Sequence, residues 1–177
     1  LSIMLGSVYH IGGAFKKTLR ALSFIPIPYS SGDDTEYEDR FSDVKSVDLN
    51  CALLNIEIEE GDVSDLEVSY EGREELLPEF QLDEKTGTLH ISQRNDQHLS
   101  DAHRDSDLTI SIPEGTALSG LSIRLDLGNV DLDEISANDV TIDVDLGNVE
   151  GEDLDTKNLH IEADLGNVEL YDTKFEN

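Results

Sequence analysis

Carboxylate side chains recur at two fixed positions in the C-terminal part of the chain, and evenly spaced carboxylates can bind metal ions or catalyse hydrolysis. The first position is held by Asp126, Asp145 and Asp164, and the second by Asp131, Glu150 and Glu169. If equivalent strands stack, neighbouring carboxylates lie about 4.8 Å apart and repel each other by about 0.9 kcal/mol in unscreened water. A Ca²⁺ ion would relieve this repulsion, because calcium prefers oxygen ligands. The pattern therefore predicts two columns of weak cation sites.

A solvated acidic face is the competing interpretation, and we favour it. Calcium-binding β-rolls have denser Gly-Asp patterns whose backbone carbonyls wrap the ion, and this repeat lacks them. A hydrolase needs two acids in different environments, whereas a repeated column offers one environment. Cys51 has no catalytic motif around it, and the five histidines show no metal-ligand spacing. We therefore expect a protein that is not an enzyme and needs no cofactor, with Ca²⁺ as the candidate ion.

The element that positions these acids is a perfect repeat, Asp-Leu-Gly-Asn-Val, at residues 126–130, 145–149 and 164–168. Apolar and polar residues alternate before each copy, which is typical of a β-strand with one buried face. The aliphatic positions are Leu121, Ile123, Leu125 and Leu127, then Val140, Ile142, Val144 and Leu146, then Leu159, Ile161, Ala163 and Leu165. Each period reads as a long strand, a Gly-Asn corner, a short strand and a polar corner, with polar corners predicted at 136–139 and 155–158.

A fixed period of this size favours a parallel β-solenoid, similar to a β-helix, in which each 19-residue unit is one coil and the aliphatic residues form internal columns. The corner glycines are Gly128, Gly147 and Gly166, and the asparagines that follow them are Asn129, Asn148 and Asn167. The glycines would supply the positive φ of a sharp corner, and the asparagines would hydrogen-bond along a column. Three hairpins of a meander are the alternative, because Gly-Asn is also a hairpin loop.

Charge and composition exclude several partners. Twelve basic residues stand against 40 acidic ones, which leaves a net charge of −28. This charge argues against binding to nucleic acid and against electrostatic adhesion to anionic lipid. The single cysteine, Cys51, excludes an internal disulfide, and its apolar strand pattern predicts a buried and inert thiol.

The N-terminal part of the chain differs from the acidic body. The first thirty residues hold Lys16, Lys17 and Arg20 and no acidic residue. Residues 1–25 read either as a membrane-proximal segment, with a membrane anchor or a removed signal upstream of Leu1, or as an amphipathic helix docked on the domain. Prolines and polar residues predict a linker at 26–43, before a β-domain at 44–177.

The first part of this β-domain matches the repeat without its glycine. Leu53-Leu54-Asn55-Ile56 corresponds to Leu165-Gly166-Asn167-Val168, so we interpret 47–58 as a degenerate first coil with a gentler corner. Irregular strands are predicted at 66–70, 87–91 and 107–112. A loop or helical turn is predicted at 74–80, and an exposed polar loop at 94–106.

The order of these features resembles the putative adhesin family of bacterial surface proteins, also known as domain of unknown function 4097. The matching segments are Asn55-Ile56-Glu57-Ile58, Gly87-Thr88-Leu89-His90-Ile91, the segment from Leu108 to Thr116, and the Gly-Asn-Val corners. The resemblance spans roughly Val44 to the end. It implies an all-β solenoid-like fold, an N-terminal signal or membrane segment, and links to envelope-stress systems of Gram-positive bacteria. No catalytic residues are established for the family.

These observations predict an extracytoplasmic domain at the bacterial cell surface, anchored to the membrane by a segment outside this sequence. It would bind or scaffold a protein or glycan of the cell envelope through its flat faces or the 94–106 loop. The alternatives are a membrane-tethered envelope-stress regulatory domain acting through an open β edge, and a Ca²⁺-binding β-roll-like module. The repeat stops at 172–177, before another long strand, so we expect either a truncated chain or an edge-to-edge homo-oligomer.

Overall fold

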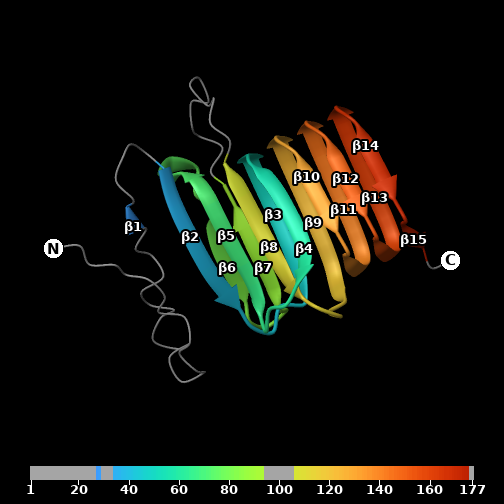
Figure 1. The fold of residues 1–177 in the computed structure, drawn as a ribbon, viewed down its shortest axis with the longest axis horizontal. Helices are drawn as coiled ribbons and strands as arrows, with labels where there is room; N and C mark the ends of the chain where they lie inside the picture. The colour runs from blue at the N-terminus through green and yellow to red at the C-terminus, as the bar shows by residue number, and fades with distance from the viewer. Residues whose placement is uncertain (1–26, 29–33, 94–105, 176–177) are drawn as a thin grey trace.

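The computed structural model describes residues 27–28, 34–93 and 106–175, which form an all-β fold of two facing sheets (Figure 1). From edge to edge, sheet A contains β1 (Ile27–Pro28), β2 (Asp34–Phe41), β5 (Leu66–Arg73), β8 (Asp107–Pro113), β4 (Asn55–Gly61), β10 (Val130–Asp133), β12 (Val149–Glu152) and β14 (Val168–Tyr171). Sheet B contains β15 (Lys174–Phe175), β13 (Asp155–Leu165), β11 (Ser136–Leu146), β9 (Leu118–Leu127), β3 (Ser46–Leu53), β7 (Thr88–Ser92) and β6 (Glu79–Asp83).

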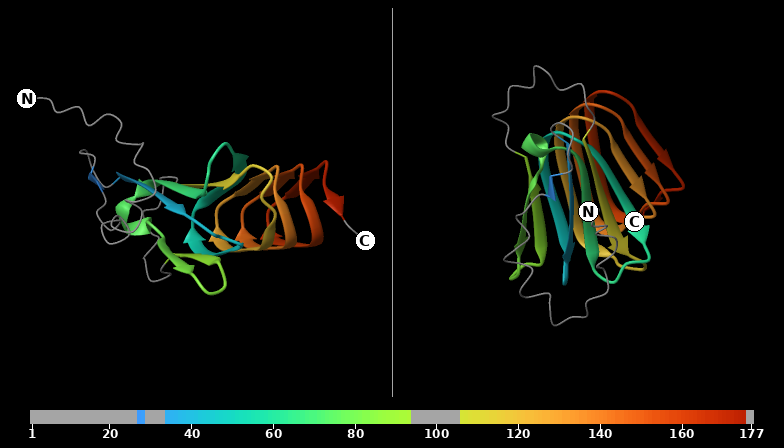
Figure 2. Two further views of the ribbon diagram at one scale, coloured as in Figure 1. Left: turned by 90° about the horizontal axis from the view of Figure 1, so that it is seen from below. Right: turned by 60° about the vertical axis from the view of Figure 1, so that its left-hand side comes forward.

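Each copy of the repeat forms one coil, with a long strand in sheet B, the Gly-Asn corner and a short strand in sheet A. The coils β9–β10, β11–β12 and β13–β14 pair in parallel and in register, so that Leu121 lies beside Val140 and Val140 beside Leu159. This arrangement excludes the meander alternative, because strands joined by a hairpin are antiparallel. Two mostly parallel sheets built from stacked coils, seen edge-on in Figure 2, agree with the predicted solenoid-like fold.

The predicted coil without a glycine is present, but it does not lie at the end of the stack. In β3–β4, Leu49 pairs with Ile123 and Ile56 with Val130, in the same register as the repeated coils. On the other side, β3 pairs with β7 and β4 with β8, so that this coil is enclosed. The expectation of a terminal coil was wrong because later strands, β7 and β8, return to cover its outer side.

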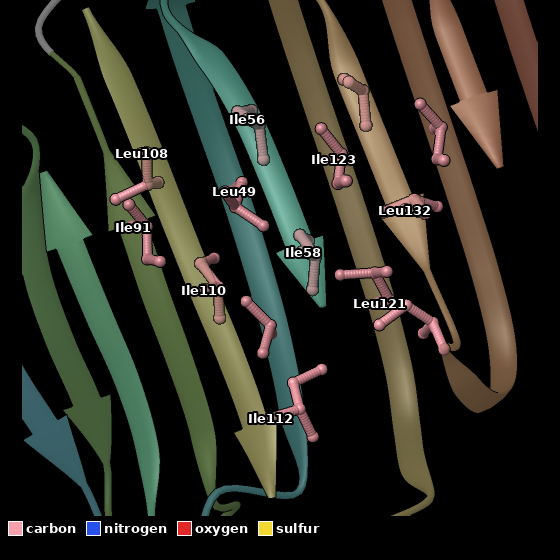
Figure 3. Close-up of a cluster of buried hydrophobic side chains, with 14 of the residues drawn as sticks. Leu49, Ile56, Ile58, Ile91, Leu108, Ile110, Ile112, Leu121, Ile123 and Leu132 are labelled. Carbon is pink, nitrogen blue, oxygen red and sulfur yellow. The ribbon is translucent and has the colours of Figure 1, made fainter. Parts of the chain in front are cut away.

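The core fills the space between the two sheets. Inward-facing side chains form rows across the strands of each sheet, and one row holds Ile91, Leu49, Ile123 and Ile142, none of them more than 1% exposed. Figure 3 shows this interior, with Leu49 and Ile123 on sheet B facing Ile56 and Ile58 on sheet A. Burying one such side chain contributes about 1.5–3 kcal/mol, so the rows explain how a narrow, strongly acidic chain folds.

One set of aliphatic residues does not belong to the core as predicted. Leu127, Leu146 and Leu165 are 40%, 46% and 68% exposed. Leu125 and Val144 are the last inward-facing side chains of β9 and β11, because the backbone of each strand then turns outward into its glycine corner. The buried positions of these strands therefore end two residues earlier than the sequence predicted, at Leu125 rather than Leu127 and at Val144 rather than Leu146.

The second corner of each coil also differs from the prediction. Residues 136–139 and 155–158, expected to be polar corners, are the first residues of the long strands β11 and β13. The chain turns earlier, at Glu134, Asp153 and Asp172, whose φ values are 55°, 51° and 46°. An acidic residue in the left-handed region, rather than a run of polar residues, marks this corner.

The N-terminal end of the stack is closed by antiparallel strands and aromatic rings. Residues 34–41 of the predicted linker form β2, which pairs with β5 along its whole length, so the linker prediction was wrong there. From β2, Tyr37 stacks on Phe80 of β6 with ring centroids 4.9 Å apart, and Phe41 lies 6.4 Å from the same ring. The predicted turn at 74–80 is the short 3₁₀ helix η1 (Glu74–Leu76), followed by the unpredicted strand β6.

Two predicted segments lie outside the described residues. They are the N-terminal segment 1–25 and residues 94–105 of the predicted loop. Ser106, the last residue of that loop, is described and is buried rather than exposed. Within the described part of the chain, no helix is long and apolar enough to cross a membrane.

Candidate functional site

The outer face of sheet A gathers carboxylates in two columns. Residues of β4, β10, β12 and β14 lie in register. In β4 and β10 the outward side chains alternate with buried aliphatic ones. One column consists of Glu57, Asp131, Glu150 and Glu169, and the other of Glu59, Asp133 and Glu152; we call these seven residues the acidic face. The column predicted from Asp131, Glu150 and Glu169 is therefore present, with Glu57 as an additional member.

The other predicted carboxylates lie on sheet B, on the far side of the Gly-Asn corner. Asp126, Asp145 and Asp164 are held at one level, because the residues on either side of them pair in register. Asp145 and Asp164 are exposed, and Asp126 is half-buried. The structure thus brings each predicted set together but keeps the two sets on separate sheets.

Four members of the acidic face were missed, although the sequence held a signal for them. Glu57 and Glu59 follow Asn55 with the alternation that follows Asn129, so extending the alignment to the glycine-free coil would have found them. Asp133 and Glu152 occupy the next outward position of their short strands, two residues after Asp131 and Glu150.

Sheet B has a mixed outer surface, in which some acids lie beside bases and others, such as Asp143 and Glu162, lie beside acids. Asp48 of β3 lies beside His90 of β7, with Oδ2 and Nδ1 3.0 Å apart. Arg124 of β9 lies beside Asp143 of β11, with Nε 3.5 Å from Oδ2. The acidic face of sheet A consists of carboxylates alone, whereas elsewhere on the outer side of this sheet Arg40 of β2 forms an ion pair with Glu67 of β5, with Nη2 2.6 Å from Oε1.

The Gly-Asn corners form an asparagine ladder along the edge between the sheets. The side-chain amide of Asn129 donates to Oδ1 of Asn55, that of Asn148 to Asn129, and that of Asn167 to Asn148, over 3.2–3.4 Å. Each of these asparagines also donates its backbone amide to the same oxygen. The predicted ladder is confirmed, and Asn55 adds a rung that ends on Asp107, whose carboxylate accepts from the Asn55 side chain over 3.0 Å.

The corner glycines are required by close backbone contact. A Cβ on Gly147 would lie 1.6 Å from the carbonyl oxygen of Gly128, and one on Gly166 would lie 1.6 Å from that of Gly147. Gly128 and Gly147 have the predicted positive φ, with values of 144° and 156°. Gly166 is not among the glycines with positive φ. Contact between successive corners is the constraint that all the repeated glycines share.

A metal site is not formed by the described side chains. Among residues 27–28, 34–93 and 106–175, no group of three or more histidine, cysteine, aspartate or glutamate side chains is arranged to hold a metal ion. The carboxylates of each column instead line up one per coil, in single file. The weak cation columns remain a prediction from the sequence.

Cys51 is part of the core rather than of a site. Its side chain is 2% exposed in β3, and burial raises the pKa of the thiol to about 12. A protonated, buried thiol is a poor nucleophile, which agrees with the predicted inert role.

A hollow of about 160 Å³ lies near the N-terminal end of the stack, between the turns that follow β2 and β8. Its lining includes the aspartates Asp43 and Asp65, the hydroxyls of Ser64 and Thr116, and the apolar side chain of Ile112. The hydroxyl of Ser64 donates to the Asp65 carboxylate over 3.2 Å, which ties one of these acids to its neighbour.

Among the described residues, no strand covers the far side of the last coil along its full length, so its inward-facing side chains are only partly covered. Ile142 in β11 is fully buried, whereas Ile161, its partner in β13, is half-buried. In β14, the inward-facing Val168 and Leu170 are 43% and 37% exposed, and the outward-facing Tyr171, beside Glu152, is 46% exposed. The hydroxyl of Tyr171 donates to the Glu169 carboxylate over 2.6 Å, and this hydrogen bond is the main cause of the raised pKa of Tyr171.

The fold and these surfaces define a class of protein: an all-β domain of stacked coils whose outer faces repeat their side chains. The family model of the toastrack domain DUF4097 matches residues 44–177, and the chain belongs to this family. No curated protein matches the chain. The comparisons indicate no catalytic family.

Two solved structures of bacterial proteins are similar to this chain. A putative cell adhesion protein from Clostridium sporogenes is 13% identical, with a TM-score of 0.52 over 78% of this chain and 99% of that chain. A putative adhesin from Bacteroides fragilis is 10% identical, with a TM-score of 0.44 over 79% of this chain and 98% of its own. At these identities the first similarity shows the fold alone.

Proposed function

We propose that this domain is a non-enzymatic binding or scaffolding module of the bacterial cell envelope, located outside the cytoplasm. The observation that carries the proposal is the repetition of the same outward side chains coil after coil, above all on the acidic face. A repeated surface suits an extended or repetitive partner, because each coil offers the same contact again. Membership of the DUF4097 family and the fold shared with a putative cell adhesion protein support the same function.

A binding experiment with isolated bacterial envelopes tests this proposal. The labelled chain should sediment with the envelopes, and neutralising the four-residue column of sheet A should reduce the bound fraction at least fivefold. This variant combines Glu57→Gln, Asp131→Asn, Glu150→Gln and Glu169→Gln. The control neutralises four acids of sheet B, with Asp143→Asn, Asp145→Asn, Glu162→Gln and Asp164→Asn, and should bind like the original chain. Equal binding by all three proteins, or binding by none, would contradict the proposal.

A second candidate function is a membrane-tethered regulatory domain of the envelope-stress response that acts through its open edge. The uncovered last coil favours this function, because an exposed strand edge with apolar side chains beside it can pair with another chain. Covering this edge should then change the response of cells to envelope stress. Neutralising the acidic face should leave that response unchanged, which separates the second candidate from the first.

A further inference from the structure

The C-terminal end of the stack combines two free strand edges with an uncovered core. We define the open edge as Leu159–Leu165 of β13 and Val168–Tyr171 of β14. Among the described residues, no strand pairs with the open edge on the side away from β11 and β12. Leu165 is 68% exposed and Val168 43% exposed, whereas Val149, which lies beside Val168 one coil earlier, is 1% exposed. An added strand would therefore gain both backbone hydrogen bonds and apolar burial.

The chain itself shows what kind of strand fits this edge. β15 already pairs with the first residues of β13, in parallel, and places Lys174 beside Asp155. Two coils earlier, between β9 and β11, Arg124 lies beside Asp143 and forms an ion pair with it. In both places a basic side chain is the neighbour of an acidic one across the strands of sheet B.

Among the described residues, no lysine or arginine lies beside the outward acids of the open edge in β13 on the side away from β11. Glu162 lies beside Asp143 and 4.0 Å from the imidazole of His160, and Asp164 follows it on the same face. An acidic side chain beside Glu162 would be repelled by about 0.9 kcal/mol in unscreened water. A lysine or arginine at the same place would be attracted instead. Between these outward residues, Ile161 and Ala163 face the half-covered core and require aliphatic neighbours.

A second copy of the chain is a poor occupant on these grounds. Its own open edge carries the same acids, and β6 at the opposite end of sheet B presents Glu79 and Asp83. Each of these pairings would bring carboxylates together across the new strands.

We propose that the open edge binds an extended segment of a partner protein in which aliphatic residues alternate with lysine or arginine. The segment extends sheet B beyond β13, with its aliphatic side chains over Ile161 and Ala163 and its basic side chains beside Glu162 and Asp164. This inference rests on the second candidate function, since it names the chemistry of the partner at the edge through which that function would act.

A fluorescent seven-residue peptide that alternates lysine with valine, with blocked termini, serves as the probe for the full chain. Anisotropy should show saturable binding. A peptide of the same composition with its lysines and valines in separate blocks should bind at least tenfold more weakly, and one alternating glutamate with valine should not bind. Hydrogen exchange should show protection of residues 159–165 by the alternating peptide. Equal binding of the alternating and block peptides would overturn the proposal, because it would reflect net charge alone.

Two variants locate the contact. Glu162→Lys reverses an exposed charge beside the bound strand and should weaken binding at least tenfold. Glu57→Lys makes the same change on β4, far from the open edge, and should alter binding less than twofold. Ala163→Lys places a charge on the inner side of β13, where it blocks aliphatic neighbours, and should abolish binding while the melting temperature stays within a few degrees. Equal weakening by the two glutamate variants would contradict the assigned site.

The oligomeric state and the envelope response separate the remaining outcomes. A dimer in sedimentation that is lost in Ala163→Lys would identify a second copy as the occupant and overturn the proposal. If Ala163→Lys changes the stress response of cells but the alternating peptide does not bind, the proposed regulatory function stands and the partner chemistry is wrong. If the peptide binds and Ala163→Lys leaves the response unchanged, the regulatory function is wrong and the binding site stands.

Discussion

The two ends of the stack differ in how their core is covered; Figure 1 shows β2 near one end and β14 at the other. At the N-terminal end, β2 and β6 bring Tyr37 and Phe80 into a stacked pair that closes the core. At the C-terminal end, the last coil keeps the shape of a repeat unit and leaves aliphatic side chains exposed. Within the described residues, strands that do not belong to the repeat cover the N-terminal end of the stack, whereas no such strand covers the last coil.

The burial of equivalent residues measures this difference. Ile123 and Ile142 are at most 1% exposed because a coil covers each of them on both sides, whereas Ile161 is covered on one side. The same substitution should therefore lower the free energy of unfolding by different amounts in an inner coil and in the last coil. Four predictions test this difference.

The largest effect is expected at the corner glycines. Gly147→Ala places a Cβ 1.6 Å from a backbone oxygen between two fixed coils, and it should destabilise the fold by about 3 kcal/mol or more. Gly166→Ala makes an equally close contact, but the last coil can move away, so the loss should be less than half as large. Urea denaturation followed by circular dichroism measures both.

The control for the glycine variants is Gly120→Ala in β9. Its Cβ would make only ordinary contacts, the nearest at 3.8 Å, so stability should change by less than about 0.5 kcal/mol. Equal losses for Gly147→Ala and Gly166→Ala would mean that the last coil is as rigid as the inner ones, and the contrast between the ends would fail.

A core truncation should show the next largest difference. Ile142→Ala removes a fully buried side chain and should cost about 2–5 kcal/mol, because the surrounding coils cannot collapse into the space. Ile161→Ala, at the same position one coil later, should cost about 1 kcal/mol, since its side chain is already in contact with solvent. The two free energies of unfolding are compared under the same conditions, and a ratio near one would refute a frayed C-terminal end.

The asparagine ladder provides a smaller and more local test. Asn148→Ala removes the oxygen that accepts both the backbone and the side-chain amide of Asn167, and should cost about 1–2 kcal/mol. Asn167→Ala leaves that oxygen in place and should cost about 0.5 kcal/mol. Amide exchange of residue 167 should accelerate in the first variant and stay slow in the second. Equally fast exchange in both would indicate that the ladder does not hold the corner.

The sequence predicted the repeated half of the molecule well, because its constraints are local and recur. The Gly-Asn corner demands close backbone contact and an amide ladder, and both follow from stacking identical units. The carboxylate column followed from the same register. Each of these inferences needed only the residues of one coil and the period at which they recur.

The N-terminal half was harder to predict because it depends on contacts between distant segments. Nothing near β3 indicates that β7 will occupy its outer side, some forty residues later in the chain. The strand β2 has an acidic, proline-flanked sequence typical of a linker, and its role depends on Tyr37 reaching Phe80. Where a coil meets a unique neighbour rather than a copy of itself, periodicity carries no information.

The smallest effect is expected in the carboxylate column, which also tests its relation to cations. Glu150 lies between Asp131 and Glu169 in register, so Glu150→Gln should stabilise the fold by about 0.5 kcal/mol at low salt. The gain should vanish near 1 M salt, where the Debye length is about 3 Å. Glu169→Gln, at the end of the column, removes one carboxylate neighbour and weakens the hydrogen bond from Tyr171, so it should stabilise less.

Thermal melts with Ca²⁺ and with Mg²⁺ at equal ionic strength extend this comparison. If the column is a solvated face, the two ions raise the melting temperature equally, because both act by screening charges that are arranged in single file. A saturable increase specific to Ca²⁺ would instead follow from preferential binding to the folded state. Its loss in Glu150→Gln and its persistence in Glu169→Gln would locate the ion in the middle of the stack, where both neighbours are present, and would convert the acidic face from a solvated surface into a calcium site.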